Sequence, residues 1–509
     1  MPIVIDSSKM VCEHVEEIAR RGASIELSGA SLEAVGRCRD KLEEKIAAGA
    51  VMYGVNTGIG ELASVTLEPQ QIKDFQRYLV YSHAAGQGKP ADEEVSRAGW
   101  ASRIKVLSQG HSGVRPEVLQ RMVQMLNLHL TPVACVRGSV GACGDLSPMS
   151  QMALTLIGEG QVYLDGKIVP AMEGLSAKGL TPLEFEARDG LATINGSNVI
   201  TGMGALQVRD AERWIRTADI AAGMTLDALL TNMISYDARL HEIRGHAGSV
   251  VCARNILRIT KGSEILAQKE KKVQDAYSLR STPQVQGPAR DVIRYARDVI
   301  ETELNGVADN PVFFPDEEDV FYIPGANFQG TPMAFGLEFL GTAVTTVAAL
   351  SERRLNRLLN PNLSRGLPSF LVKGAGMFSG MMLTQYTAGA LVCESRVLTT
   401  PACHGSIPAA ADQEDFVSMG MTTALKTREI LDHVCGVLGI ELLNAAQAFE
   451  FRKPLRAGEG CQAAYECIRE HCAPLVEDRP LYEDINTMTR LVKEGTILKA
   501  VEEAIGPLE

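Results

Sequence analysis

The chain has 509 residues and a formal net charge of −12, and 45% of its residues are hydrophobic. With acidic and basic residues mixed along an acidic chain, neither nucleic acid nor an anionic membrane surface is expected as the main partner. The length predicts more than one domain, because single cores rarely grow beyond about 250–300 residues.

The cellular compartment is indicated by three features of the sequence. The N-terminal segment has neither a basic region nor a long apolar stretch, so no signal peptide is predicted. Residues 335–350 form the most apolar long stretch, but Glu338 interrupts it and it is too short for a membrane span. Eleven cysteines at irregular spacings do not indicate a disulfide framework, so reduced thiols in the cytoplasm are expected.

The N-terminal half predicts mostly helices with one β element. A short strand is expected at the start of the chain. Asp165-Gly166 separates two β-prone runs and predicts a hairpin with strands at residues 161–164 and 167–169. Apolar periodicity predicts helices over residues 31–46, 70–82, 94–109, 116–130 and 198–232.

The C-terminal half is dominated by long helices. The longest is expected to begin at Pro332 and to end at Asn360-Pro361, and its many small or apolar residues predict burial on several sides. Further helices are expected over residues 376–397, 416–450 and 458–472, with a shorter one near the C-terminus. The predicted fold is mainly α, a long central helix bundle with a smaller N-terminal domain containing minor β structure. The expected division is residues 1–195 and residues 196–509.

A cluster of thiols near the C-terminus is expected to be structural. Its spacing contains no C-x-x-C pair, so buried thiols are favoured and no metal site is predicted. The cluster consists of Cys461, Cys467, His471 and Cys472.

The stretch of small residues from Gly138 to Pro148 is the most unusual in the chain. Small neighbours leave the backbone around Cys143 almost bare, so tight turns are possible there. Such a backbone could bring the amide nitrogen of Gly144 to the carbonyl carbon of Ala142, the first step of a cyclisation. Taken alone, the stretch is better explained as a turn that leads into a helix.

Four other irregular segments place polar residues beside glycines or before a helix. In a mainly helical protein, sites are built on such loops. Singly, each has a structural explanation: Tyr277 as a packed aromatic, Arg280 as a surface cation and Glu414 as an acid at a helix N-terminus. The segments are residues 53–60, 274–287, 325–330 and 411–416.

In combination, these segments resemble the aromatic amino acid ammonia-lyase and aminomutase family, which depends on a methylidene-imidazolone (MIO). The resemblance runs from about Tyr53 to about Lys453. It rests, in order, on Tyr53-Gly54-Val55-Asn56-Thr57-Gly58, Ser82-His83, Gly138 to Pro148, Asn195-Gly196, Gln274 to Val285, Gly325 to Phe328, Ser351-Glu352-Arg353-Arg354 and Gln413-Glu414-Asp415.

The resemblance implies that Ala142-Cys143-Gly144 cyclises autocatalytically to the MIO through a dehydroalanine at residue 143. This ring is an electron sink made from the chain, so no external cofactor and no metal are expected. Cys143 stands where serine is typical of the family. Elimination needs only a β-leaving group, so the thiol is expected to leave as hydrosulfide.

The resemblance also implies roles for five side chains around the ring. Tyr53 corresponds to the base that removes the β-proton, and Arg280 to the clamp on the substrate carboxylate. Asn195 and Tyr277 correspond to residues that support the ring and the developing charge. Phe328 is expected to form a wall beside the substrate ring.

Two positions favour L-histidine as the substrate, giving trans-urocanate and ammonia. His83 follows a serine, which is the histidine-type pattern in this family. Glu414 is acidic where the phenylalanine and tyrosine enzymes usually carry a neutral residue, and a carboxylate suits a polar imidazole. Two residues differ from the histidine-type pattern. Phe416 stands where that pattern often has His, and Asp412 stands where it commonly has Asn.

Other functions remain open at the level of sequence. The chain could be a lyase or a 2,3-aminomutase acting on another aromatic amino acid, or a non-catalytic helical scaffold if Cys143 blocks cyclisation. A fumarase- or aspartase-type lyase is disfavoured, because the Gly-Ser-Ser-x-Met-Pro type of loop is missing. The family forms homotetramers, so the expected partners are a small amino-acid substrate and three further copies of the chain.

Overall fold

The computed structural model describes residues 2–509, and its contacts divide the chain into two compact units. Unit 1 comprises the chain up to Arg209 with Ala296–Leu337 and Pro401–Leu425, and unit 2 comprises Asp210–Tyr295, Glu338–Thr400 and Lys426–Glu509. Each unit is assembled from three stretches of chain. The domains expected from the sequence are instead two continuous segments that meet at residue 195. These units do not test that boundary, so it stays a prediction.

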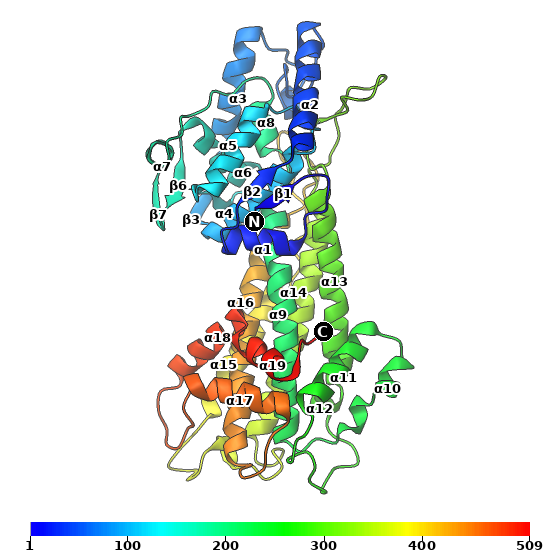
Figure 1. Ribbon diagram of the computed structural model, residues 1–509, viewed down its shortest axis with the longest axis vertical. Helices are drawn as coiled ribbons and strands as arrows, with labels where there is room; N and C mark the ends of the chain where they lie inside the picture. Colours follow the sequence, from blue (N-terminus) through cyan, green and yellow to red (C-terminus); the bar gives the residue numbers. More distant parts are fainter. Residues whose placement is uncertain (1) are drawn as a thin grey trace. The chain divides into compact units, whose positions relative to one another are not determined.

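The prediction of a mainly helical fold is confirmed, with nineteen α-helices over residues 2–509 (Figure 1). Unit 1 contains α1 (Cys12–Arg20), α2 (Gly29–Ala47), α3 (Pro69–His83), α4 (Glu93–Leu107), α5 (Pro116–Asn127), α6 (Leu146–Leu154), α7 (Ala171–Ala177) and α8 (Asp189–Ile194). Unit 2 contains α10 (Ala238–Glu242), α11 (Ala247–Ile259), α12 (Tyr277–Arg280), α15 (Met382–Leu398), α17 (Glu459–His471), α18 (Tyr482–Glu494) and α19 (Thr496–Ile505). Four longer helices contribute residues to both units: α9 (Asn198–Ala228), α13 (Thr282–Asn305), α14 (Thr331–Leu359) and α16 (Gly420–Glu450). Short 3-10 helices cover Gly60–Leu62, Thr155–Ile157, Met233–Tyr236 and Ser369–Leu371.

The β structure described belongs to unit 1 and forms small separate sheets. The predicted hairpin is confirmed: its two strands pair antiparallel, with Leu164 opposite Lys167. Asp165 and Gly166 have φ values of +49° and +76°, the left-handed conformation that a tight two-residue hairpin turn requires. The strands are β1 (Ile3–Ile5) parallel to β2 (Ile25–Leu27), β3 (Gln87–Pro90) with β5 (Cys135–Arg137), β4 (Thr131–Pro132) with β6 (Gln161–Leu164) and β7 (Lys167–Pro170), and β8 (Val312–Phe313) with β9 (Tyr322–Ile323).

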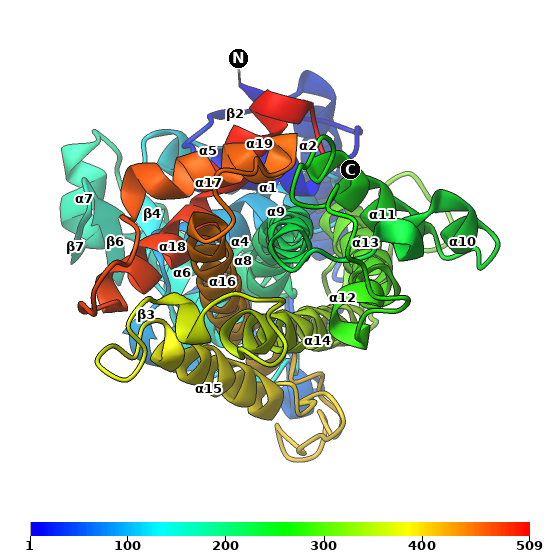
Figure 2. The same ribbon diagram turned by 90° about the horizontal axis from the view of Figure 1, so that it is seen from below.

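In unit 2 the long helices lie side by side and the shorter helices surround them, as the end-on view of α9, α14 and α16 in Figure 2 shows. The apolar stripe predicted for α14 is fully buried, and it carries one polar layer. There the guanidinium of Arg354 forms an ion pair with Glu441 of α16, with Nε 2.6 Å from Oε1. Thr225 of α9 also donates a hydrogen bond to Glu441, at 2.9 Å. A satisfied buried network of this kind fixes how the helices pack.

Helix α14 is, among residues 2–509, the one helix long and apolar enough to cross a membrane by length and composition. Of its most apolar window, 61% is buried inside the protein. The core helix of a soluble protein passes the same test, and the buried stripe and ionic layer of α14 are features of such a helix.

Candidate active site

The glycine-rich loop between β5 and α6 has a left-handed backbone conformation, which favours glycine, at two points. Gly141 and Gly144 have φ values of +82° and +79°. A Cβ atom on Gly144 would lie 2.2 Å from the carbonyl carbon of Gly196, and one on Gly141 would lie 2.1 Å from the Oγ atom of Ser418. Real Cβ atoms do not approach other atoms so closely, and the backbone of Gly196 leaves no space for a side chain at Gly144. At Gly141 the Ser418 hydroxyl would have to move, and the left-handed φ itself favours glycine. The tight turns expected beside Cys143 are present at these two glycines.

Backbone hydrogen bonds hold this loop from two sides. The amide of Gly196 donates to the carbonyl oxygen of Cys143 at 3.2 Å, and the amide of Asp145 donates back to the carbonyl of Gly196 at 2.9 Å. On the other side, the amide of Met419 donates to the carbonyl of Val140 at 3.0 Å. Residue 143 thus lies between two anchored stretches of backbone.

The side chain of Cys143 contacts the carboxylate of Glu414. Its Sγ–H donates a hydrogen bond to Oε1 of Glu414 at 3.0 Å. Glu414 is positioned by a tight backbone pairing with Ala409, in which each amide donates to the other residue's carbonyl. Burial raises the pKa of the Cys143 thiol far above its usual value, and the hydrogen bond and charge of Glu414 raise it further. The thiol is therefore protonated at neutral pH.

Tyr53 belongs to the same group of side chains. Its hydroxyl oxygen accepts a hydrogen bond from the amide of Gly60 at 3.1 Å. Burial raises the pKa of the Tyr53 phenol, and Cys143 and Glu414 add to the increase, while the Gly60 amide opposes it. Three residues expected from the sequence to act together, Tyr53, Cys143 and Glu414, are thus brought within electrostatic reach of one another in unit 1.

Asn195 caps the C-terminus of α8 and directly precedes Gly196, whose amide donates to the carbonyl of Cys143. Its side chain is only 3% exposed, and its Oδ1 atom is buried without a hydrogen-bond partner. An unsatisfied buried acceptor costs about 1–3 kcal/mol, so a donor supplied at this point would be favoured.

His83 and Phe328 lie on segments that pack around the same loop. His83 is the last residue of α3, and its Nδ1 is 2.8 Å from the carbonyl oxygen of Leu79. A proton on Nδ1 satisfies that carbonyl and leaves Nε2 as an acceptor. Helices α3, α6 and α8 pack against one another. The carbonyl of Phe328 accepts a hydrogen bond from Ser197 Oγ at 2.6 Å, which fixes its loop beside the Asn195–Ser197 segment.

Tyr277 and Arg280 form a separate pair in unit 2. Both lie on the single turn of α12, where the guanidinium carbon of Arg280 is 4.6 Å from the centre of the Tyr277 ring. Nε of Arg280 donates to the carbonyl of Asp275 at 2.9 Å, and Tyr277 is 73% exposed. The candidate site residues therefore occur in two groups, one in each unit.

One residue that was not singled out from the sequence is Asp145, which directly follows Gly144. Its carboxylate is buried and accepts a hydrogen bond from the amide of Ile200 at 2.9 Å. Burial raises its pKa to about 7, against the lowering effect of its hydrogen bonds. Ser139 Oγ donates to the carbonyl of Gly144 at 3.2 Å and lies 3.4 Å from Oδ1 of Asp145. The sequence does contain a feature that could have identified it, because Asp145 is the only charged residue between Gly138 and Pro148.

The residues present fit an MIO at positions 142–144. Residue 143 is preceded and followed by small residues, Gly144 packs directly against the backbone of Gly196, and the orphaned Asn195 oxygen lies on that adjoining segment. Over residues 2–509, no cluster of three or more His, Cys, Asp or Glu side chains suits a metal ion. The predicted burial of the C-terminal thiols is confirmed for Cys461, Cys467 and Cys472.

Comparison with known proteins supports the same assignment. Residues 10–470 match the aromatic amino acid lyase family model. The chain is 42% identical to the histidine ammonia-lyase of Alkaliphilus oremlandii over 99% of both chains, and 44% identical to that of Symbiobacterium thermophilum over 97% of both. Among solved structures, it resembles the tyrosine aminomutase of Streptomyces globisporus, with a TM-score of 0.96, 35% identity and full coverage of both chains. It also resembles the histidine ammonia-lyase of Trypanosoma cruzi, with a TM-score of 0.92 and 34% identity over 99% of this chain and 96% of that one. The chain therefore belongs to the aromatic amino acid lyase family.

Proposed function

We propose that the protein eliminates ammonia from L-histidine to give trans-urocanate, in the cytoplasm, using an MIO made from Ala142-Cys143-Gly144. The observation that carries this proposal is the 3.0 Å contact between Glu414 and Cys143. It places an acidic side chain against the residue that becomes the electrophile. The relatives named histidine ammonia-lyase, 42–44% identical over nearly the whole chain, support the same substrate.

Formation of the ring uses only atoms of the chain. The amide nitrogen of Gly144 attacks the carbonyl carbon of Ala142, and that carbonyl oxygen leaves as water. The Cα proton of Cys143 is removed, its Cβ–Sγ bond breaks, and hydrosulfide takes up a proton and departs as hydrogen sulfide. The left-handed turns at Gly141 and Gly144 support the compact backbone that this attack needs. One water and one hydrogen sulfide are lost, a decrease of about 52 Da.

Once formed, the ring supplies an electrophilic methylene that draws electrons from the substrate amine. Tyr53, as the phenolate, removes the β-proton, and its place beside Cys143 and Glu414 supports that role. Arg280 binds the substrate carboxylate through N–H groups at the edge of its planar guanidinium, which can donate two parallel hydrogen bonds. Tyr277 and the amide of Asn195 donate hydrogen bonds that stabilise the developing charge. Phe328 bounds the substrate ring.

Specificity for histidine rests on Glu414 and His83. An imidazole N–H of the substrate would donate to the Glu414 carboxylate, whereas a phenyl ring would leave that carboxylate desolvated and unpaired. His83, with Nδ1 at the Leu79 carbonyl, would offer Nε2 to the same polar ring.

A second candidate function is a 2,3-aminomutase acting on another aromatic amino acid. The TM-score of 0.96 with a tyrosine aminomutase is the observation that favours it. The two functions share the ring and Tyr53 and differ in whether ammonia departs or is added back at the β-carbon.

A comparison of three substrates tests the proposed function. The ultraviolet absorbance of the conjugated acid should give a kcat/KM for L-histidine at least about 100-fold above those for L-phenylalanine and L-tyrosine. Glu414→Gln removes the charge opposite the imidazole and should lower the value for histidine by about 10- to 100-fold. Glu318→Gln, at an exposed position of unit 1, makes the same charge change and should be silent. Preference for tyrosine, or a β-amino acid product, would overturn the assignment.

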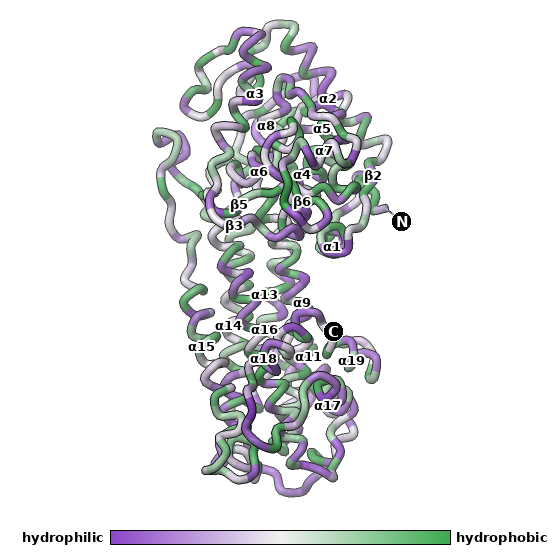
Figure 3. Tube along the Cα trace, turned by 90° about the vertical axis from the view of Figure 1, so that its left-hand side faces the viewer, coloured by the Kyte–Doolittle hydropathy of each residue, from purple (hydrophilic) through white to green (hydrophobic). Residues whose placement is uncertain are grey.

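We further propose a homotetramer, supported by apolar side chains on the surface of unit 2. Leu383, Tyr386 and Val397 of α15 and Tyr295 of α13 are exposed, and Figure 3 shows apolar residues along α15. Apolar surface of this kind on a soluble chain marks an interaction site. Size-exclusion chromatography with light scattering should give about four times the chain mass of 54.9 kDa. A stable and active monomer would contradict it.

A further inference from the structure

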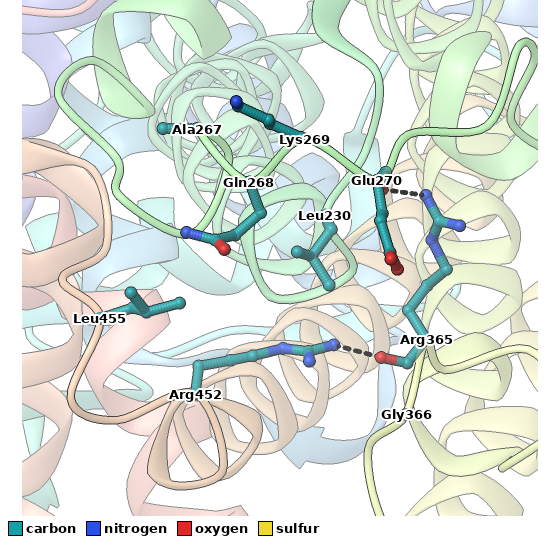
Figure 4. A pocket seen from close by; sticks show the side chains of 9 residues that line it. All are labelled: Leu230, Ala267, Gln268, Lys269, Glu270, Arg365, Gly366, Arg452 and Leu455. Carbon is teal, nitrogen blue, oxygen red and sulfur yellow. Dashed lines mark hydrogen bonds between the residues drawn. The ribbon is translucent and has the colours of Figure 1, made fainter.

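Unit 2 contains a cavity of about 880 Å³ whose wall carries unpaired positive charge (Figure 4). Its charged lining residues are Lys269, Glu270, Arg365 and Arg452, and its apolar lining includes Leu230 and Leu455. Ligand pockets in proteins typically measure about 300–1,000 Å³. The volume and the mixed lining are thus those of a site for a small organic molecule bearing an anionic group.

Both arginines contact backbone carbonyls and keep part of their donors: Arg452 engages Nε and Nη2, the latter also with the carbonyl of Ser364 at 3.3 Å, and keeps Nη1. Nε of Arg452 donates to the carbonyl of Ala228 at 2.8 Å, and its Nη2 donates to the carbonyl of Arg365 at 3.0 Å. Arg365 makes one long contact, from Nη2 to the carbonyl of Glu270 at 3.5 Å, and its Nε is buried without a partner. A guanidinium has five N–H donors in a planar fork, which matches carboxylate and phosphate oxygens.

The positive charges of Arg365, Arg452 and the nearby Lys271 repel one another. Burial lowers the pKa of Arg452 to about 10, and the neighbouring charge of Arg365 contributes to the decrease. Burial also lowers the pKa of Lys271, and Arg365 again contributes. Over residues 2–509, no carboxylate lies within 4.0 Å of the charged nitrogens of Arg365, Arg452 or Lys271. An anion placed among them would relieve the repulsion.

The carboxylates that face this cluster are already engaged elsewhere. Asp227 accepts hydrogen bonds from Ser263 Oγ at 2.6 Å and from the amide of Gly458 at 2.8 Å. Asp275 accepts one from the amide of Asn232 at 2.7 Å. Glu270 lines the cavity, where its single charge stands against three cations of the lining. The cavity therefore retains a net positive wall in a chain whose overall charge is −12.

We propose that this cavity binds a small organic phosphate, with the phosphate on Arg365 and Arg452 and the organic part against Leu230 and Leu455. A phosphate dianion presents enough oxygens to engage both guanidinium groups at once. The proposal is independent of the proposed catalytic function, because it uses none of the residues assigned to catalysis.

The occupied cavity would also hold the segment that leads into α12. Lys271 donates to the carbonyls of Leu230 and Thr231 at 3.1 and 3.2 Å, on the wall of the cavity. Asp275, four residues later, accepts from Asn232, and its own carbonyl accepts from Arg280. An anion that fixes Arg365 at the carbonyl of Glu270 therefore fixes the start of this segment.

Calorimetric titration of the assembled protein with glucose 6-phosphate tests the site, with glucose and inorganic phosphate as comparison ligands at constant ionic strength. Saturable binding of glucose 6-phosphate is expected, tighter than that of either comparison ligand. Arg365→Gln should weaken it about 10- to 100-fold, because a charged hydrogen-bonding partner is lost. Arg365→Lys keeps the positive charge but loses the planar guanidinium, so it should weaken the binding of glucose 6-phosphate less than Arg365→Gln does. Arg244→Gln, at an exposed arginine of unit 2 outside the cavity, is the matched control.

Amide hydrogen exchange on the same samples locates the ligand. Glucose 6-phosphate should protect residues 267–275 in the wild-type protein and in Arg244→Gln, but not in Arg365→Gln. The proposal fails if no phosphate binds saturably, which is also the outcome if a carboxylate of another subunit fills the cavity. It fails equally if Arg365→Gln binds as tightly as the wild-type protein or if protection appears only elsewhere. If inorganic phosphate bound as tightly as glucose 6-phosphate, the claim that the site recognises the organic part of the ligand would be overturned.

Discussion

Replacing Cys143 with alanine is expected to lower activity on L-histidine at least about 10³-fold while leaving the protein folded. Alanine has no β-leaving group, so the exocyclic double bond cannot form. The side chain of Cys143 makes one hydrogen bond, to Glu414, so its removal should cost little stability. Intact mass measured on the same sample should equal the encoded mass for the variant, and should be about 52 Da lower for the wild-type protein.

Two further variants test whether the loss of activity in Cys143→Ala is due to the missing leaving group at residue 143. Cys143→Ser should remain active and lose about 36 Da, two waters, because a hydroxyl can also leave. Cys393→Ala removes an exposed thiol of α15 and should change neither the activity nor the mass deficit. An unmodified mass in the active wild-type protein would overturn the MIO assignment. Hydrogen sulfide released in a one-to-one ratio to chains during maturation would support loss of the sulfur.

The local elements of this fold could be predicted from the sequence because their signals are local. Asp165-Gly166 specifies its hairpin through left-handed turn residues, and the stripe of α14 specifies a buried helix through its spacing. The predicted start of a helix was less accurate where a tight backbone pairing takes the place of the first helical turn. Helix α16 begins at Gly420 rather than residue 416, and Glu414, just before it, pairs with Ala409 instead.

The geometry of the site could not be derived from local patterns, because its contacts join residues far apart in the chain. Cys143 and Glu414 are 271 positions apart. The pairing of Gly144 with Gly196 is a backbone contact that no side-chain pattern encodes. Family resemblance supplied which residues belong together. The structure adds the direction of the Cys143 hydrogen bond, the orphaned oxygen of Asn195 and the buried Asp145 carboxylate.

Replacing Tyr53 with phenylalanine is expected to lower kcat by about 10²- to 10⁴-fold with a small change in KM, as for loss of a general base. In the unmodified chain, burial, Cys143 and Glu414 together raise the pKa of Tyr53. A base must be deprotonated, and a raised pKa makes the phenolate scarce at neutral pH. Activity should therefore rise with pH towards the pKa of Tyr53. Loss of the sulfur in ring formation removes one contribution to that pKa and brings the phenol closer to its working range.

The pH profile of kcat/KM distinguishes this role from a structural one. Tyr53→Phe should lose the rise of activity with pH while keeping the mass deficit of about 52 Da, because ring formation does not need the phenol. The variant leaves the Gly60 amide without its acceptor, at a cost of about 1 kcal/mol, which thermal unfolding can measure. Tyr78→Phe, on the exposed face of α3, removes a hydroxyl from the same unit and should preserve both rate and profile. If Tyr53→Phe retained the pH dependence of the wild-type protein, the base would have to be a different group, and Glu414 would be the nearest candidate to test.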